Sequence, residues 1–270
     1  MAIDLKQLIQ SRKNTSPPRI LVYGVQGCGK TEFASNSPAP VFIFTEDGAG
    51  SLPVNSFPLA KSYDDVMTYI TALCTEDHSY KTLVVDSLDW FEPLVWGRLV
   101  QDNSTASKTL QKIEEIGYGK GYTMALDYWR EYLDAINFLR NEKDMAIIQI
   151  AHSDVKRFES PSSDSYDRYT VKLHAKASAL LQEHSDCVFF ANYSTHVTEE
   201  KLGFNNTRKR AVGGDQRFIY TQERPAYAAK NRYGLPESIL LEQGMPTWEV
   251  LAKHIPWFDQ FTNPATTQGE

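Results

Sequence analysis

GVQGCGKT, residues 24–31, fits the pattern G-x-x-x-x-G-K-[ST] at every fixed position. The apolar run at residues 20–23 predicts a buried strand before it, and residues 32–34 can open a helix after it. A strand, a glycine-rich loop and a helix in this order hold a polyphosphate through inward-pointing backbone N–H groups and the helix dipole. The stretch therefore predicts a nucleotide site at the end of the first strand of an α/β fold.

The loop residues have separate expected roles. Lys30 is expected to reach the β- and γ-phosphates, and Thr31 is expected to bind Mg²⁺. An ordinary glycine-rich turn is the alternative, but a chance match to the pattern in a chain of average composition is on the order of 1%. The predicted nucleotide-binding residues of the loop are Gly24, Gly27, Cys28, Gly29, Lys30 and Thr31.

Three further apolar runs predict buried strands, and a polar residue follows each of them: Glu46, Asp86 and His152. An aspartate after a buried strand, downstream of the phosphate loop, is the pattern that places a carboxylate near Mg²⁺. Polar residues at the carboxyl ends of central strands face the nucleotide crevice in open α/β sheets. We therefore expect all three at the site, although a solvated loop at Glu46 and a hydrogen-bonded core histidine at His152 remain alternatives.

The order of the elements predicts the fold class. Strands alternate with helices as far as residue 193, which predicts a mostly parallel central sheet flanked by helices. Helices are expected at residues 63–73, 124–140 and 173–184. The β-rich residues 195–221, with a turn expected at Gly213-Gly214, predict an antiparallel extension at the C-terminal side.

Three polar stretches are candidates for nucleic-acid contact. Residues 97–121 are expected to be irregular, with tyrosines for base stacking, although a helix-start turn is equally compatible with their glycines. Residues 153–169 read as a long unstructured polar insert. Residues 201–217 carry five basic residues and one acidic residue, which suits either a polyanion or a solvated hairpin. The candidate DNA-binding residues are Tyr118, Lys120, Lys156, Arg157, Arg208, Lys209 and Arg210.

Composition excludes several classes of protein. The 270 residues are 41% hydrophobic and 23% charged, as in a globular protein, and no apolar stretch approaches the ~18 residues of a membrane span. The N-terminus lacks the features of a signal peptide. Three unpatterned cysteines fit a reducing cytoplasm and no cysteine metal site, and Cys28 reads as a small filler. The net charge of −6 means that any nucleic-acid contact must come from local patches.

With these pieces in order, the chain resembles the RecA-type ATPases. It is most similar to the small phage-encoded RecA-like group of single-strand annealing and recombination, a branch of the phage AAA-type nucleotide-binding proteins. The resemblance covers residues 18–240, without the extra DNA-binding domain of bacterial RecA. Beyond the loop, the segments that carry it are VFIFTEDG (41–48), LVVDSLDW (83–90), IGYGKGY (116–122) and KNRYGLP (230–236).

The resemblance implies roles for individual residues. Glu46 matches the glutamate that activates the attacking water, and Asp86 matches the metal-site aspartate. His152 stands where the family commonly keeps a glutamine as γ-phosphate sensor, which is a departure from the family pattern. Lys230 and Arg232 are implied to reach the nucleotide of an adjacent subunit. The implied segments are an N-terminal helix or arm (1–17), a RecA-like ATPase domain (18–244), and a C-terminal helix and tail (245–270).

The expected function is accordingly a Mg²⁺-dependent ATPase that binds single-stranded DNA and promotes strand annealing and recombination in the cytoplasm. Expected partners are single-stranded DNA, further copies of the chain in a ring or filament, and a single-strand-binding protein of phage or host. A motor or helicase loader acting on proteins would use the same ATP site. A small-molecule kinase should carry an arginine-rich lid, and no clear lid follows residue 100. A GTPase needs Asn-Lys-x-Asp after a strand, whereas residues 141–144 read Asn-Glu-Lys-Asp and precede their strand.

Overall fold

The computed structural model describes residues 15–48, 50, 52–117, 119–159, 164–201, 207–241 and 247–262. Of residues 195–201, 207–213 and 215, only the course of the backbone is described. Residues 1–14 of the implied N-terminal helix or arm, and the predicted stacking residue Tyr118, lie outside the described part. In that part, no helix is long and apolar enough to cross a bilayer.

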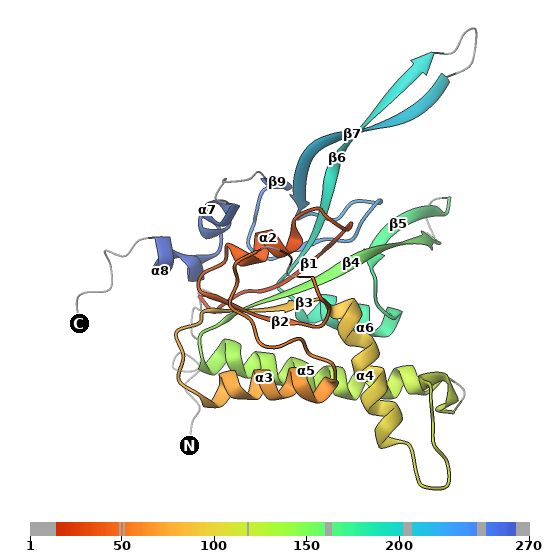
Figure 1. Cartoon of the computed structure of the whole chain (residues 1–270). Helices are drawn as coiled ribbons and strands as arrows, with labels where there is room; N and C mark the ends of the chain where they lie inside the picture. Colours follow the sequence, from red (N-terminus) through yellow and green to blue (C-terminus); the bar gives the residue numbers. More distant parts are fainter. Residues whose placement is uncertain are drawn as a thin grey trace, which may run out of the picture.

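Within the described residues, nine strands form one sheet in the order β2-β3-β4-β1-β6-β7-β9, with β5 paired to β4 and β8 to β6 (Figure 1). From β2 to β6 the neighbours pair in parallel, and β7 and β9 add antiparallel strands. This confirms the predicted α/β class with a mostly parallel sheet and an antiparallel C-terminal extension. The bounds are β1 Arg19–Gly24, β2 Pro40–Phe44, β3 Thr82–Asp86, β4 Ala146–Phe158, β5 Tyr166–Val171, β6 Cys187–Lys201, β7 Thr207–Tyr220, β8 Lys230–Asn231 and β9 Ser238–Leu241.

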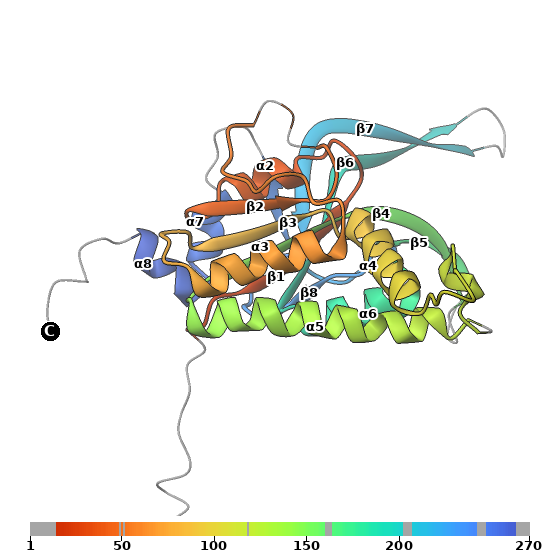
Figure 2. The same cartoon turned by 60° about the horizontal axis from the view of Figure 1, so that its bottom comes forward.

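Helices cover both faces of the sheet, and each face has its own buried core (Figures 1 and 2). The central strands are apolar at successive positions because both of their faces are buried. On β1, Leu21 and Tyr23 face one core, while Ile20 and Val22 face the other. One face carries α3 Tyr63–Thr75, α4 Leu88–Asp102, α5 Gly121–Glu142 and α6 Ala175–His184; the other carries α2 Lys30–Ser35, α7 Thr247–Ala252, η2 Pro256–Phe258 and α8 Asp259–Thr262.

The prediction that residues 97–121 are irregular is wrong at both ends. Helix α4 continues to Asp102, because Phe91, Val95 and Leu99 recur every four residues and are all buried against the sheet. Helix α5 begins at Gly121, with the single 3₁₀ turn η1 Ile113–Glu115 before it. Irregular backbone is therefore confined to a shorter connection.

The polar stretch 153–169 is not an unstructured insert. Strand β4 continues beyond the sheet body to Phe158 and forms a hairpin with β5, in which Lys156 lies opposite Arg168. Arginine side chains make contacts across this hairpin. Arg157 Nη1 lies 3.7 Å from Asp167 Oδ1, and the Arg168 guanidinium lies 5.2 Å from the centre of the Phe158 ring. His152 consequently lies within a strand and not at its end.

Strands β6 and β7 continue past the sheet as a long two-stranded ribbon, whose outer residues 195–201 and 207–213 we call the β6–β7 arm (Figures 1 and 2). The expected turn at Gly213-Gly214 is wrong, because β7 runs through both glycines. The pairing shifts register between Tyr193 and Thr195, and a side chain at Gly214 would begin 2.3 Å from Ser194 Oγ. The two glycines therefore serve this irregularity, and not a reversal of the chain.

Candidate nucleotide site

The phosphate loop links the end of β1 to the start of α2, and its shape depends on glycine. Gly29 has a φ of 90°, in the left-handed region that favours glycine. At Gly24 a Cβ atom would lie 1.9 Å from the carbonyl oxygen of Ala191 on β6, so no larger residue fits. Cys28 is fully buried and its Sγ donates to the same carbonyl oxygen at 3.5 Å, which places its side chain behind the loop.

Lys30 lies beneath the loop with only 6% of the residue exposed. Its Nζ donates to the carbonyl oxygens of Gly24 at 3.2 Å and Val25 at 2.9 Å. A buried ammonium group requires such partners, because an unpaired charge is strongly disfavoured away from water. The amine is therefore positioned at the loop by bonds that an anionic ligand can replace.

Thr31 and Asp86 meet although 55 residues separate them. Thr31 Oγ1 donates to Asp86 Oδ2 at 2.7 Å. Burial raises the pKa of Asp86 to about 6, against the lowering effect of the Thr31 hydrogen bond. A hydroxyl and a carboxylate are hard oxygen ligands, and Mg²⁺ binds through one or two such groups together with water and substrate phosphates. The pair therefore fits the protein's share of a Mg²⁺ site.

Glu46 and His152 complete the carboxyl edge of the sheet. Glu46 Oε1 accepts a hydrogen bond from the Ser87 hydroxyl at 2.8 Å and lies 3.9 Å from His152 Nδ1. His152 is tied to Asp89 of α4, whose Oδ1 accepts from the His152 backbone N–H at 2.9 Å and whose Oδ2 lies 3.0 Å from Nδ1. Burial alone would raise the pKa of Asp89, but the hydrogen bonds from His152 hold it below its usual range.

These side chains line one cavity of about 370 Å³. Parallel pairing explains their convergence, since Gly24 lies beside His152 and Phe44 beside Asp86 in the sheet register. The structure brings together there five residues that the sequence predicted for the site, together with the loop glycines Gly27 and Gly29: Lys30, Thr31, Glu46, Asp86 and His152.

Sequence patterns did not predict the contacts that Arg217 and Tyr193 make beside the phosphate loop. Arg217 of β7 lines the cavity, and its Nη1 lies 2.9 Å from Oε2 of Glu32. Tyr193 of β6 donates from its hydroxyl to the Gly27 carbonyl oxygen at 2.9 Å. Arg217 was only counted within a basic stretch, and nothing local in the sequence indicates that β6 and β7 place these two residues side by side beside the loop.

Lys230 and Arg232 lie away from this chain's own phosphate loop. Lys230 Nζ donates to the carbonyl oxygens of Gln182, Glu183 and Ser185 at 3.1, 2.9 and 2.6 Å. Arg232 Nη1 lies 3.1 Å from Asp186 Oδ1. Within the chain Lys230 therefore stabilises the C-terminal end of α6, and Arg232 pairs with a carboxylate that follows the helix.

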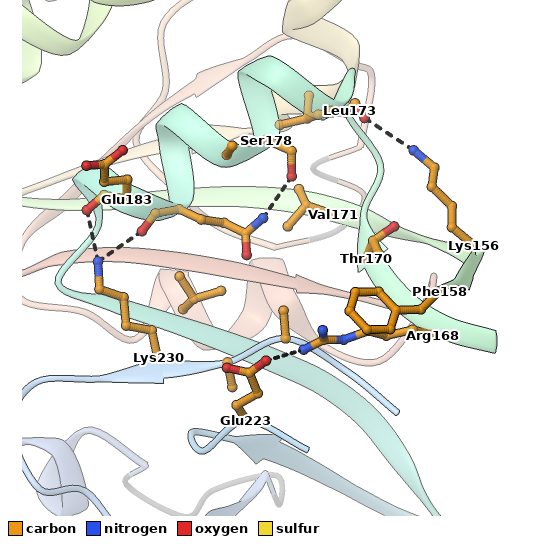
Figure 3. Close-up of a pocket in the computed structure, with 16 residues that line it drawn as sticks. Lys156, Phe158, Arg168, Thr170, Val171, Leu173, Ser178, Glu183, Glu223 and Lys230 are labelled. Atoms are coloured by element: carbon orange, nitrogen blue, oxygen red, sulfur yellow. Dashed lines mark hydrogen bonds and ion pairs between the residues drawn. The ribbon is translucent and has the colours of Figure 1, made fainter. Parts of the chain in front are cut away.

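Lys230 also lines a second cavity, of about 570 Å³, between β5 and α6 (Figure 3). Lys156 lies on its opposite side, where Nζ is 3.5 Å from the Leu173 carbonyl oxygen. Arg168 lies beside Phe158 and pairs with Glu223 at 2.6 Å. Two of the cations at this second cavity, Arg168 and Lys230, are therefore already paired within the protein.

The remaining candidate DNA-binding residues lie on separate elements. Lys120 is exposed at the start of α5, and Arg157 is exposed on the β4–β5 hairpin, where Nη2 donates to Ser165 Oγ at 2.9 Å. Arg208, Lys209 and Arg210 belong to β7 in the β6–β7 arm, and their side chains are outside the described part. The start of α5, the hairpin and the arm lie on the right-hand side in both views, with the arm at the top and the start of α5 at the bottom of Figure 1 (Figures 1 and 2).

Comparison with known proteins identifies the family to which this chain belongs. No curated relative matches the chain significantly. Among solved structures, the crystal structure of the RadB recombinase is similar at 14% identity and a TM-score of 0.44, covering 83% of this chain and 86% of its own. The family model described as an AAA domain, AAA_24, matches residues 16–233, which include the whole nucleotide site. The chain therefore belongs to the AAA domain family and is a nucleotide-binding ATPase.

Proposed function

We propose that the protein is a Mg²⁺-dependent ATPase of the RecA type that binds single-stranded DNA and promotes strand annealing and recombination. The observation that carries the ATPase part is the 2.7 Å contact between Thr31 and Asp86, with Lys30 and Glu46 in the same cavity. The DNA part is supported by the exposed basic residues Lys120, Lys156 and Arg157, by the basic run at residues 208–210, and by the sequence resemblance described above.

In this proposal the loop binds the triphosphate of ATP. Lys30 leaves the carbonyl oxygens of Gly24 and Val25 and pairs with the phosphates, whose charge makes them stronger acceptors. Thr31 and Asp86 would hold Mg²⁺, which would neutralise charge on the phosphate oxygens. Asp86 must lose its proton for this, which its pKa of about 6 permits at neutral pH.

Glu46 is the base of the proposed reaction. The hydrogen bond from Ser87 fixes one oxygen of its carboxylate, which leaves the other free to orient and deprotonate the attacking water. His152 lies 3.9 Å from the fixed oxygen and is held by Asp89. These contacts support a role in which His152 responds to the γ-phosphate and passes that response to α4 through Asp89.

The proposed DNA path runs over the start of α5, the β4–β5 hairpin and the β6–β7 arm. Lys120, Lys156, Arg157 and the basic residues 208–210 would neutralise phosphates there, and tyrosine or phenylalanine rings would stack with bases. Because the chain as a whole has a charge of −6, binding depends on these local cations and should weaken steeply with salt. A ring or filament would bring the nucleotide of one copy towards Arg232 of the next, whose side chain is 52% exposed.

The test measures ATP hydrolysis with and without single-stranded DNA, together with annealing of complementary strands. We expect DNA to stimulate hydrolysis, and Lys30→Ala to lower turnover by at least about 100-fold in a chain that still folds, since electrostatic stabilisation of transferring phosphate is the main source of rate. Parental turnover in Lys30→Ala would contradict the ATPase site. Hydrolysis without DNA binding at low salt would instead favour a loader acting on protein partners.

A further inference from the structure

Arg217 stands out among the residues at the nucleotide cavity because it comes from the antiparallel extension and not from the parallel sheet. It and Lys30 are the two basic side chains, lysine or arginine, that line the described part of the cavity. The Arg217 side chain is 21% exposed, and its Nη1 lies 2.6 Å from where a Cβ atom of Gly29 would be. The guanidinium therefore rests directly against the phosphate loop.

The partner of Arg217 is a carboxylate that has no other assigned task at the site. Glu32 follows Thr31 on α2, and its Oε2 lies 2.9 Å from Arg217 Nη1, with 34% of the Glu32 side chain exposed. Ion pairs with this much exposure contribute little to stability. An arginine held so loosely next to a phosphate loop can exchange its partner when a more highly charged anion arrives.

Tyr193 places the base of the β6–β7 arm against the same loop. It pairs with Arg217 in the register of β6 and β7, and its hydroxyl bonds to the Gly27 carbonyl oxygen. Two adjacent strands thus each send one side chain to the loop. The Tyr193 hydrogen bond holds the paired residues Tyr193 and Arg217, which precede and follow the β6–β7 arm, against the phosphate loop. The Arg217 guanidinium therefore stays close to a phosphate bound by the loop.

We propose that Arg217 contacts the phosphates of ATP bound in its own chain, and that Glu32 holds the guanidinium until ATP takes it away. The inference rests on the proposed ATP site and adds a residue to it. A planar guanidinium donates two parallel hydrogen bonds to phosphate as readily as to carboxylate, and the triphosphate offers more negative charge. Exchange of Glu32 for phosphate also ties nucleotide binding to the first residues of the β6–β7 arm.

The test compares nucleotide affinity in Arg217→Ala and Glu32→Gln, using a fluorescent ATP analogue and the corresponding ADP analogue with the full chain. We expect Arg217→Ala to weaken ATP binding about 10- to 100-fold, as for loss of a charge-assisted hydrogen bond. Glu32→Gln should tighten binding about two- to fivefold, because the competing carboxylate is gone. Adding Glu32→Gln to Arg217→Ala should bring no gain.

A purely structural ion pair makes the opposite prediction for Glu32→Gln, because both substitutions would then lower the unfolding temperature and weaken binding alike. That result, or parental ATP affinity in Arg217→Ala, would overturn the inference. Arg224→Ala is the matched control, since Arg224 pairs with Glu237 away from the cavity and should leave affinity unchanged. If the parental chain itself failed to bind ATP, that result would contradict the proposed function as well as the role of Arg217. If the parental chain binds ATP and Lys30→Ala does not, the ATP site is supported, and the Arg217→Ala result then tests the role of Arg217 alone.

Discussion

The two cavities of this molecule both contain lysine and arginine side chains, but those charges have different partners. In the cavity at the phosphate loop, Lys30 bonds to two loop carbonyl oxygens and Arg217 to a carboxylate that is about one third exposed. In the larger cavity beside α6, Lys230 bonds to three carbonyl oxygens at the end of that helix. The partners of the cationic side chains, and not the cavity volume, therefore distinguish the proposed anion site at the phosphate loop from the structural contact at the end of α6.

Helix α6 explains the position of Lys230 at the second cavity. At the start of the helix, both carboxylate oxygens of Glu92 lie 3.0–3.1 Å from the backbone nitrogen of His174. At its end, Lys230 lies among the last carbonyl oxygens. A negative group at the N-terminus and a positive group at the C-terminus complement the helix dipole and satisfy groups that lack partners within the helix. Lys230 therefore stabilises the C-terminal end of α6.

The assignment of the cavity at the phosphate loop as the reactive one of the two is tested most strongly at Glu46. Replacing it in Glu46→Gln removes the proposed base but keeps an acceptor for the Ser87 hydroxyl, so the cavity should be preserved. We expect turnover of ATP to fall by about 100-fold or more, with nucleotide affinity within a few-fold of the parent. Single-turnover hydrolysis and binding measured on the same preparation provide the check. Unchanged turnover would remove Glu46 from the reaction.

The next largest effect is expected at Glu92, through pH. Burial raises the pKa of Glu92 to about 7, and Asp89 adds to this, while the His174 backbone N–H and Lys156 oppose it. Because the folded protein binds this proton more tightly than the unfolded chain does, the contribution of Glu92 is most favourable at low pH and is lost between about pH 4.5 and 7. Glu92→Gln should therefore be the more stable form at pH 8, by about 2 kcal/mol.

The measurement is the difference in unfolding free energy between the parent and Glu92→Gln across pH 5 to 8, from denaturant titrations. The difference should grow as the pH rises and level off above about pH 7. A difference that is constant with pH would mean that the Glu92 carboxylate is not penalised by burial. Hydrolysis of ATP should change little, since Glu92 lies outside the nucleotide cavity.

The smallest effect is expected at Lys230. Lys230→Met keeps most of the aliphatic chain but leaves three carbonyl oxygens at the end of α6 without this donor, so we expect a loss of about 1 kcal/mol in unfolding free energy. The exposed Lys253 provides a control in Lys253→Met, which should be neutral. A Lys230→Met protein with parental stability and lost turnover would instead assign Lys230 to the nucleotide of a neighbouring copy.

Local sequence patterns were sufficient for the part of the site that parallel strands build. Lys30 and Thr31 belong to one continuous motif, and Glu46, Asp86 and His152 follow apolar runs whose carboxyl ends share one sheet edge. Arg217 and Tyr193 were not predictable, because their position depends on an antiparallel register with an irregularity beside Tyr193. The β4–β5 hairpin was misread for a related reason: polar pairs across its strands stabilise it, and no single strand shows them.

The most direct test of the account is a crystal structure of the protein with Mg²⁺ and a non-hydrolysable ATP analogue. We expect the triphosphate in the cavity at residues 24–31, with Mg²⁺ between Thr31 and Asp86, Lys30 on the phosphates, and Arg217 released from Glu32. A nucleotide bound in the cavity beside α6, or a phosphate loop that remains empty at saturating analogue, would contradict the account.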